Sequence, residues 1–198
     1  MDELVRRLLT SEDRAVTEVM AFMSYNPSIG RVFEKRGVAK FQEIMTSAVD
    51  KLVKVQCEAD FDKLHRECVS KVVKKIKTSR NRRPSWGQGQ KAVNVFFKVY
   101  VDWARKPNDE TRERLLPHLH VPLDRIVMSS IKEEYSEDYE SIIKPLITTR
   151  TQEFSLSKID EKLYSVWQRF FREKCPKKPL VFDLIWATKR GKLKKPLQ

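Results

Sequence analysis

Glycine and cysteine are both scarce in this chain, which has five glycines and three cysteines among 198 residues. No Asn-Gly or Asp-Gly pair occurs, so tight two-residue β-hairpins have little support. Cys57, Cys68 and Cys175 are odd in number and far apart, which argues against a disulfide framework, a zinc site and a four-cysteine iron–sulfur cluster. We therefore expect reduced thiols and no bound metal or cofactor.

Long apolar runs are missing as well. No segment is long and apolar enough to cross a bilayer, and the N-terminus carries no apolar signal segment. These absences argue against a membrane protein and a secreted one, and we expect a cytoplasmic protein.

The composition is that of a globular protein. Hydrophobic residues make up 40% of the chain and charged residues 34%, with ten Phe and four Trp available for a core. No linker or internal repeat divides the sequence, and its length suits one sizeable domain. We predict a single helical globular unit over residues 1–198.

Positive charge is concentrated in two blocks. The net charge is +13, yet residues 71–106 hold 11 Lys and Arg against 1 acidic residue, and residues 169–198 hold 10 against 2. Two such blocks indicate a polyanionic partner, and nucleic acid fits best because aromatic and polar residues lie among the basic ones. An anionic membrane surface and a merely solvated basic face are the alternatives.

Apolar residues recur at helical spacing through most of the chain, which predicts an all-α fold. A first helix, capped by Ser11, should end at Asn26-Pro27. Residues 78–90 should form a polar basic loop. Further helices are predicted at residues 38–56, 59–77, 91–105, 108–116, 122–134, 136–147, 158–173 and 179–189.

The segment 91–105 needs separate treatment because its β-prone residues alternate as in a strand. Polar residues decide the question. Lys91, Asn94 and Lys98 recur at steps of three and four, which is one stripe of a helix, and we predict a mostly buried helix. Ser85 and Gln88 also form a possible capping box ahead of it.

Two short segments carry candidate chemistry. In the first, Gly87 and Gly89 permit a tight turn and close approach of another molecule, and Lys91 follows at the start of the apolar segment. A lysine in the first turn of a helix is disfavoured as the charged ammonium, which favours its use as an amine nucleophile. In the second, Pro122 suits the first helical position, which puts Asp124 in the first turn. Taken singly, Asp124 would only complement a helix dipole and Lys91 would be surface charge.

Together these segments resemble the helix-hairpin-helix DNA glycosylase superfamily, whose signature is a Gly-x-Gly-x-Lys hairpin followed by an apolar–Asp–polar segment. The matching stretches are Gly87-Gln88-Gly89-Gln90-Lys91 and Val121-Pro122-Leu123-Asp124-Arg125. Pro84-Ser85-Trp86 departs from the usual Leu-Pro-Gly opening. The resemblance covers about residues 80–130, and the long interval between Lys91 and Asp124 is closest to archaeal 8-oxoguanine DNA glycosylases.

The resemblance implies a DNA glycosylase with AP lyase activity, whose hairpin and catalytic region span residues 70–135. Lys91 would attack the sugar C1′ and form a Schiff base, and Asp124 would be the catalytic aspartate. The expected partner is double-stranded DNA that contains a damaged or modified base, bound by a monomer in a prokaryotic cytoplasm and nucleoid, for base-excision repair or defence against modified phage DNA. The residues expected to contact DNA are Arg80, Arg82, Arg83, Ser85, Trp86, Gly87 and Gly89.

Several assignments stay open from the sequence. A non-catalytic helix-hairpin-helix module would grip phosphates without using Lys91 or Asp124, and a helical interaction protein would use its basic faces on an acidic protein. His118 and His120 lack a third metal ligand and should pack near Asp124. Each of the four tryptophans is more readily explained by core packing than by stacking on a base. The basic tail 189–198 could follow a phosphate backbone or only add solubility.

Overall fold

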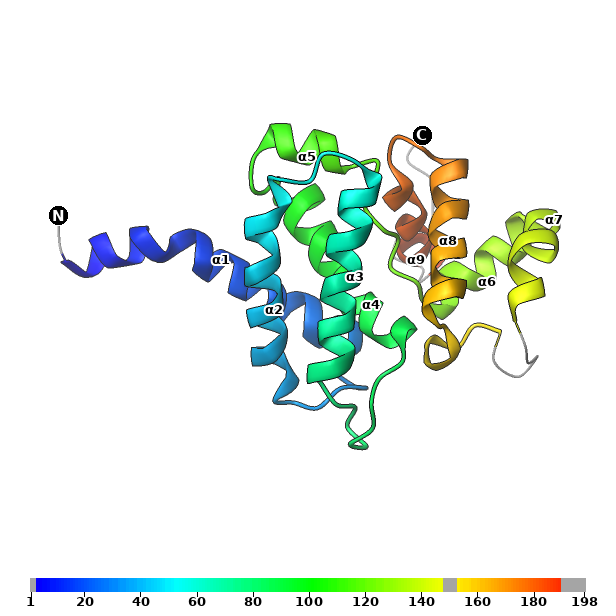
Figure 1. The fold of residues 1–198 in the computed structure, drawn as a ribbon, viewed down its shortest axis with the longest axis horizontal. Helices are drawn as coiled ribbons and strands as arrows, with labels where there is room; N and C mark the ends of the chain where they lie inside the picture. The colour runs from blue at the N-terminus through cyan, green and yellow to red at the C-terminus, as the bar shows by residue number, and fades with distance from the viewer. Residues whose placement is uncertain (1–2, 148–152, 190–198) are drawn as a thin grey trace.

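The computed structural model describes residues 3–147 and 153–189, and within these ranges the chain is helical and contains no β-strand (Figure 1). The predicted all-α fold is therefore confirmed. None of the helices in this part of the chain is long and apolar enough to cross a membrane. Apart from Lys189, the predicted basic tail lies outside the described residues.

Residues 3–119 form an N-terminal lobe. Its helices are α1 (Glu3–Ile29), α2 (Gly37–Leu52), α3 (Glu58–Lys75), α4 (Trp86–Phe97), which continues as a π-helix (Lys98–Trp103), and α5 (Asp109–Leu115). Helix α1 packs against α2 and α4, while its first turns project away from the body of the lobe (Figure 1). The core is rich in phenylalanine, including Phe41, Phe61, Phe96 and Phe97.

Residues 121–189 form a C-terminal lobe beside it (Figure 1). Its elements are α6 (Arg125–Glu134), α7 (Ser136–Asp138), a π-helix (Tyr139–Ile143), α8 (Glu161–Lys174), α9 (Leu184–Lys189), and three 3-10 turns (Lys144–Leu146, Leu156–Lys158 and Pro179–Asp183). Aromatic rings from α8 dominate its core, where Trp167 stacks on Phe171 with ring centroids 5.8 Å apart. Trp86, at the start of α4, packs against the cores of both lobes.

Helix α1 differs from its predicted bounds. It runs unbroken from Glu3 to Ile29 and includes Pro27 in its last turn, whereas the sequence predicted a start capped by Ser11 and an end at Asn26-Pro27. A proline costs one internal hydrogen bond. Tyr25 and Ile29 are buried on either side of it, and Gly30 ends the helix instead. Burial of these side chains outweighs the missing bond.

The start of α4 also differs. Ser85 and Gln88 form the predicted capping box: Gln88 N–H donates to Ser85 Oγ at 3.1 Å, and Ser85 N–H donates to Gln88 Oε1 at 3.0 Å. The helix therefore begins at Trp86, and the basic loop ends at Ser85 rather than at Gln90. The expected glycine hairpin is wrong, because Gly87 and Gly89 lie buried in the first turn of α4.

The two glycines serve close packing. The amide of Gly87 donates to the Ile159 carbonyl at 2.9 Å, and a Cβ at Gly87 would stand 2.4 Å from the Leu156 carbonyl oxygen. A Cβ at Gly89 would stand 2.9 Å from Val73 Cγ2 on α3. The glycines let α4 touch both lobes, so their amides are not presented to a phosphate.

Gly87→Ala should lower the free energy of unfolding by about 1–3 kcal/mol, because the new methyl group meets backbone that cannot rotate away. Urea unfolding would measure the change. At an open helical position alanine would instead stabilise the helix relative to glycine by about 1 kcal/mol, so a stabilised Gly87→Ala variant would contradict this packing. Arg83→Ala, on the exposed loop, is the control and should stay within about 0.5 kcal/mol of the parent.

Candidate active site at the junction of the lobes

Lys91 and Asp124 meet where the two lobes join. Lys91 Nζ on α4 lies 3.4 Å from Asp124 Oδ2, although 33 positions separate them in the sequence. Their side chains are 19% and 13% exposed. The pair is therefore shielded by the fold and still within reach of another molecule.

Asp124 has a separate partner for each carboxylate oxygen. Oδ1 accepts a hydrogen bond from the amide of Val127 at 2.9 Å and caps α6, while Oδ2 faces Lys91. Helix α6 consequently begins at Arg125, and the prediction that Pro122 is its first residue is wrong. Capping fixes the carboxylate orientation and leaves one oxygen for chemistry.

Lys91 lies in the second turn of α4, because that helix begins five residues before it. The prediction of a first-turn lysine is wrong in this respect, and the helix dipole has little effect beyond the first turn. The charged partner of Lys91 is instead the carboxylate of Asp124.

The backbone just before Asp124 is held from both sides. Gln168 on α8 accepts from the Val121 amide at 2.8 Å and donates to its carbonyl at 3.0 Å. Asn94 Nδ2 on α4 donates to the same carbonyl at 3.1 Å, and Gln90 Nε2 donates to the Leu123 carbonyl at 3.4 Å. Because Gln90 and Asn94 share a helix with Lys91, this clamp sets the distance between Lys91 and Asp124.

The clamp continues into a buried polar network. Asn94 Oδ1 lies 2.6 Å from His65 Nε2, and the Tyr164 hydroxyl lies 2.9 Å from Asn94 Nδ2 and 2.7 Å from His120 Nδ1. His120 Nε2 in turn lies 2.8 Å from Asp62 Oδ1. The network therefore joins α3, α4, α8 and the segment between the lobes. His120 was expected near Asp124, but its hydrogen bonds are to this network.

The outer end of the network is an ion pair. Arg172 Nη2 on α8 donates to Asp62 Oδ1 at 2.6 Å and to the His118 carbonyl at 2.9 Å. It also lies 2.7 Å from His120 Nε2. We call the eight residues of the clamp, the buried network and this ion pair the interlobe network: Asp62, His65, Gln90, Asn94, His120, Tyr164, Gln168 and Arg172.

Burial controls ionisation within the interlobe network. Burial lowers the pKa of His65 well below its usual value, and nearby His120 lowers it further. Burial also lowers the pKa of His120, although its hydrogen bond with Asp62 opposes this. For Asp62, burial opposes ionisation, but hydrogen bonds with His120 and Arg172 outweigh it and hold the pKa far below the usual range. In the folded protein His65 and His120 are therefore neutral, and the Asp62 carboxylate is charged.

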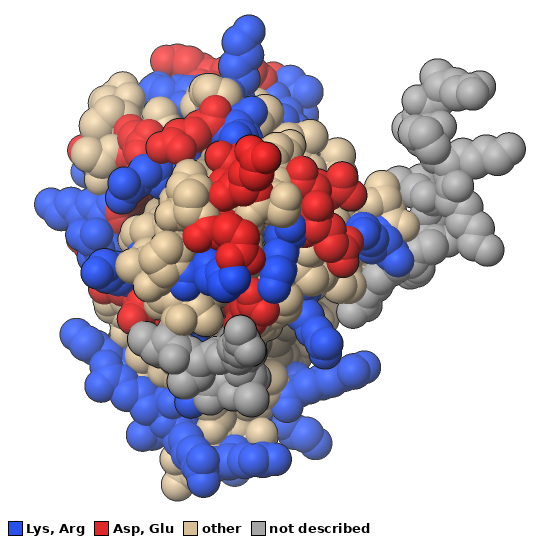
Figure 2. Space-filling view, turned by 90° about the vertical axis from the view of Figure 1, so that its right-hand side faces the viewer, with Lys and Arg blue, Asp and Glu red and all other residues tan. Residues whose placement is uncertain are grey.

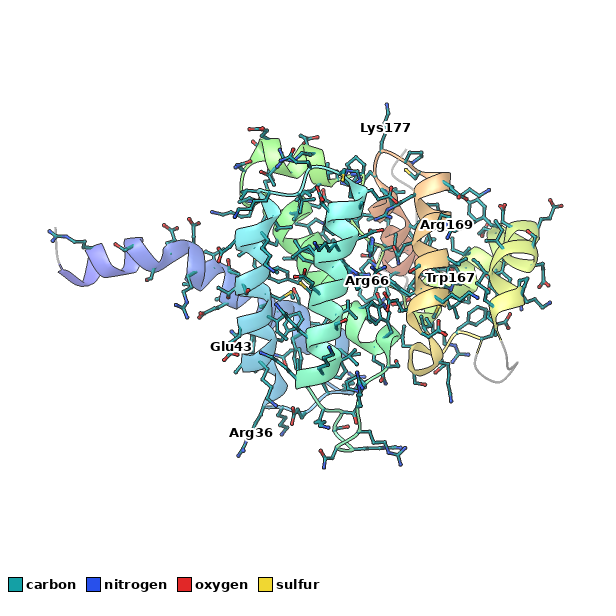
Figure 3. The ribbon with its side chains drawn as sticks, viewed as in Figure 1. Arg36, Glu43, Arg66, Trp167, Arg169 and Lys177 are labelled. Atoms are coloured by element: carbon teal, nitrogen blue, oxygen red, sulfur yellow. The ribbon has the colours of Figure 1, made fainter. Side chains whose placement is uncertain are left out.

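A cavity of about 270 Å³ lies between α3 and α8, and one wall of it is formed by the interlobe network. Trp86, Arg66 and Arg169 also line it, and Figure 3 shows the two arginines where these helices face each other. Neither Lys91 nor Asp124 is among the described residues that line this cavity. It is therefore separate from the Lys91–Asp124 pair.

The residues expected to contact DNA fall into two groups. Arg80, Arg82 and Arg83 are exposed on the loop between α3 and α4. Ser85 and Trp86 are committed to the fold: the Ser85 hydroxyl donates to the Leu156 carbonyl at 2.7 Å, and the Trp86 ring packs between the lobes. Lys and Arg side chains gather at the end of the molecule where this loop lies (Figure 2).

Sequence reasoning missed most of the interlobe network. Asn94 was noted in a polar helical stripe and His120 as a packing residue, and Gln90 appeared only as a position in the glycine motif. The polar side chains His65 and Tyr164 stand at apolar positions of amphipathic helices, which was the available signal. No group of three or more His, Cys, Asp and Glu side chains in the described part of the chain could hold a metal ion.

Comparison of the chain with protein-family models, with characterised proteins and with solved structures finds no match. The function must therefore be argued from the geometry of the site.

Acidification should destabilise the protein between about pH 6.5 and 5. The unfolded chain takes up protons on histidines that stay neutral when buried, so stability is present above the unfolded histidine pKa, about 6.5, and is lost below it. The expected loss is up to about 1.4 kcal/mol per pH unit for each histidine that stays neutral. Urea unfolding at several pH values would measure it.

A substitution tests the source of this pH dependence. His65→Gln should flatten the curve, whereas His118→Gln should change it less, because His118 is only partly buried. An unchanged slope in the His65→Gln variant would contradict the assignment.

Proposed function

We propose that the protein is a DNA glycosylase with AP lyase activity that removes a damaged or modified base from double-stranded DNA. The approach of Lys91 Nζ to Asp124 Oδ2, 3.4 Å apart, is the observation that carries this proposal. An amine nucleophile and a carboxylate in contact, partly shielded from water, are the two groups that the reaction requires.

The chemistry follows from this arrangement. Asp124 accepts the proton that the Lys91 ammonium must lose. The free amine then attacks the sugar C1′, and the base leaves with the electron pair of the N-glycosidic bond while the carboxylic acid returns a proton to it. Asp124 then takes a proton from the attached nitrogen, the C1′–O4′ bond of the sugar ring breaks, and the ring oxygen leaves with the electron pair and receives that proton, which gives the Schiff base. Loss of a proton from C2′ to a base then permits β-elimination, in which the 3′ carbon–oxygen bond breaks and the 3′ phosphate leaves. The Asp124 carboxylate also stabilises positive charge that develops on the sugar before attack.

Binding to DNA is supported by the exposed basic loop. Arg80, Arg82 and Arg83 have no ion-pair partner among the described residues, so they are available to phosphates. Because Gly87 and Gly89 lie inside a helix, the glycine hairpin supports neither the glycosylase nor the alternative of a non-catalytic hairpin module. The glycosylase proposal therefore depends on the Lys91–Asp124 pair, which a non-catalytic module does not need. The site itself does not indicate which base is removed.

Lys91→Gln should abolish covalent trapping. Borohydride reduces a Schiff base to a stable crosslink, so the parent protein should be crosslinked to duplexes that carry its substrate. A panel of oxidised purines and bulky modified pyrimidines would find that substrate. Lys98→Gln is a matched control, since Lys98 is a partly buried lysine two helical turns away and pairs with Asp183 at 2.6 Å. Crosslinking by Lys91→Gln at the parental level would refute the nucleophile.

Asp124→Asn should reduce base excision by roughly a hundredfold or more, because it removes the proton acceptor and the charge. Asparagine caps a helix as well as aspartate does, so the melting temperature should change little. Asp124→Ala separates the two roles: it should lose activity and also about 1 kcal/mol of stability with the cap. If both variants lose activity only in proportion to their unfolded fraction, Asp124 has a purely structural role.

A further inference from the structure

A groove of about 660 Å³ lies where the α1–α2 turn meets the α3–α4 loop. Four arginines line it: Arg31 from the α1–α2 turn and Arg80, Arg82 and Arg83 from the loop. Its other walls include the polar side chains Thr78, Ser79, Ser85, Gln88 and Ser157, together with Val32 and Pro84. No carboxylate is among the described residues that line it.

The two segments of the groove are bonded to each other. The Ser79 amide donates to the Val32 carbonyl at 2.7 Å, and the Glu34 amide donates to the Lys77 carbonyl at 2.9 Å. The loop is also closed on itself, because the Arg82 amide donates to Thr78 Oγ1 at 3.0 Å. The arginines therefore project from an ordered frame, which reduces the entropy lost when they bind an anion.

The charge of the groove is not neutralised within the described chain. Its four arginines are exposed and take part in none of the ion pairs between described residues. Glu34, beside the groove, already pairs with Lys40 at 3.0 Å. Arg36, in the same turn as Arg31, points away from the helices at this end of the molecule (Figure 3). Guanidinium groups without acidic partners are suited to bidentate contact with phosphate.

We infer that this groove binds the phosphodiester backbone of the DNA strand next to the reacting nucleotide, and that Arg31 is a DNA contact contributed by the N-terminal lobe outside the motif region. This inference rests on the proposed function for its choice of nucleic acid. Ser85 and Gln88 line the groove and also begin α4, so the groove ends one helical turn before Lys91. Gln88 and Lys91 are three residues apart and so lie on the same face of α4, which places the groove beside a sugar bound at Lys91.

Equilibrium binding to an unmodified duplex tests the groove without requiring catalysis. Arg31→Ala should weaken binding roughly threefold to tenfold and reduce the slope of log affinity against log salt by about 0.9, the value for one phosphate contact. Arg31→Lys should keep the slope but not the full affinity, because an ammonium lacks the bidentate fork. Fluorescence anisotropy at several salt concentrations would measure both quantities.

Three variants complete the comparison. Replacing Arg80, Arg82 and Arg83 together by alanine should reduce the slope by up to about 2.7. Arg14→Ala is the matched control, since Arg14 is an exposed arginine of α1 that pairs with Glu18 at 3.0 Å and lines a different groove. It should bind as the parent does. Lys98→Gln should also bind as the parent does, because Lys98 pairs with Asp183 and is not among the described residues that line the groove.

The possible outcomes test the groove and the glycosylase proposal separately. Parental affinity and slope in Arg31→Ala would overturn the inference and leave the glycosylase proposal intact. Absence of base excision and of trapping by the parent protein on every duplex of the panel would overturn the glycosylase proposal, while DNA binding that depends on Arg31 would still support the groove. Arg31-dependent binding to vesicles that contain phosphatidylserine, without Arg31-dependent binding to DNA, would assign the groove to a membrane surface and overturn the inference.

Discussion

The interlobe network is the constraint on which the candidate site depends. Each lobe has its own hydrophobic core, and Trp86 packs against both, but nonpolar contact is not directional and does not by itself fix how the lobes sit relative to each other. Buried polar groups without partners are costly, and the side-chain amides of Gln90, Asn94 and Gln168 all donate to the backbone at Val121 and Leu123. Satisfying these groups selects one arrangement of the lobes, and that arrangement brings Lys91 to Asp124.

Local patterns predicted the helices well, because apolar periodicity and capping depend on neighbours in sequence. The helix 59–77 corresponds to α3, and the capping box at Ser85 and Gln88 is present. The role of Gly87 was not predictable, because its neighbours Leu156 and Ile159 lie far away in the chain, and Gly89 likewise meets Val73 on another helix. Side-chain pairing across the lobes likewise has no periodic signal, and only the resemblance to a known motif suggested that Lys91 and Asp124 belong together.

The arrangement divides the work of the proposed enzyme among three regions. The four arginines of the groove belong to the N-terminal lobe. The proposed nucleophile, Lys91, lies on α4, which begins at the groove, and the carboxylate is that of Asp124, which caps α6 of the C-terminal lobe. Helix α4 connects these regions, since it starts at the groove and carries Lys91 one turn further along. A change in the packing of Gly87 or Gly89 would therefore displace both the groove proposed to bind DNA and the amine of Lys91.

The indole of Trp86 lies between two cores, and the backbone beside it is clamped at Val121 from both lobes. These contacts resist a hinge motion between the lobes, so the protein is poorly suited to closing its two lobes around a bound molecule. If the protein is the proposed glycosylase, this rigidity leaves the deformation to the DNA. Discrimination would then depend on how readily a nucleotide unstacks and swings out of the duplex, and weakly paired or distorted positions would be sampled first.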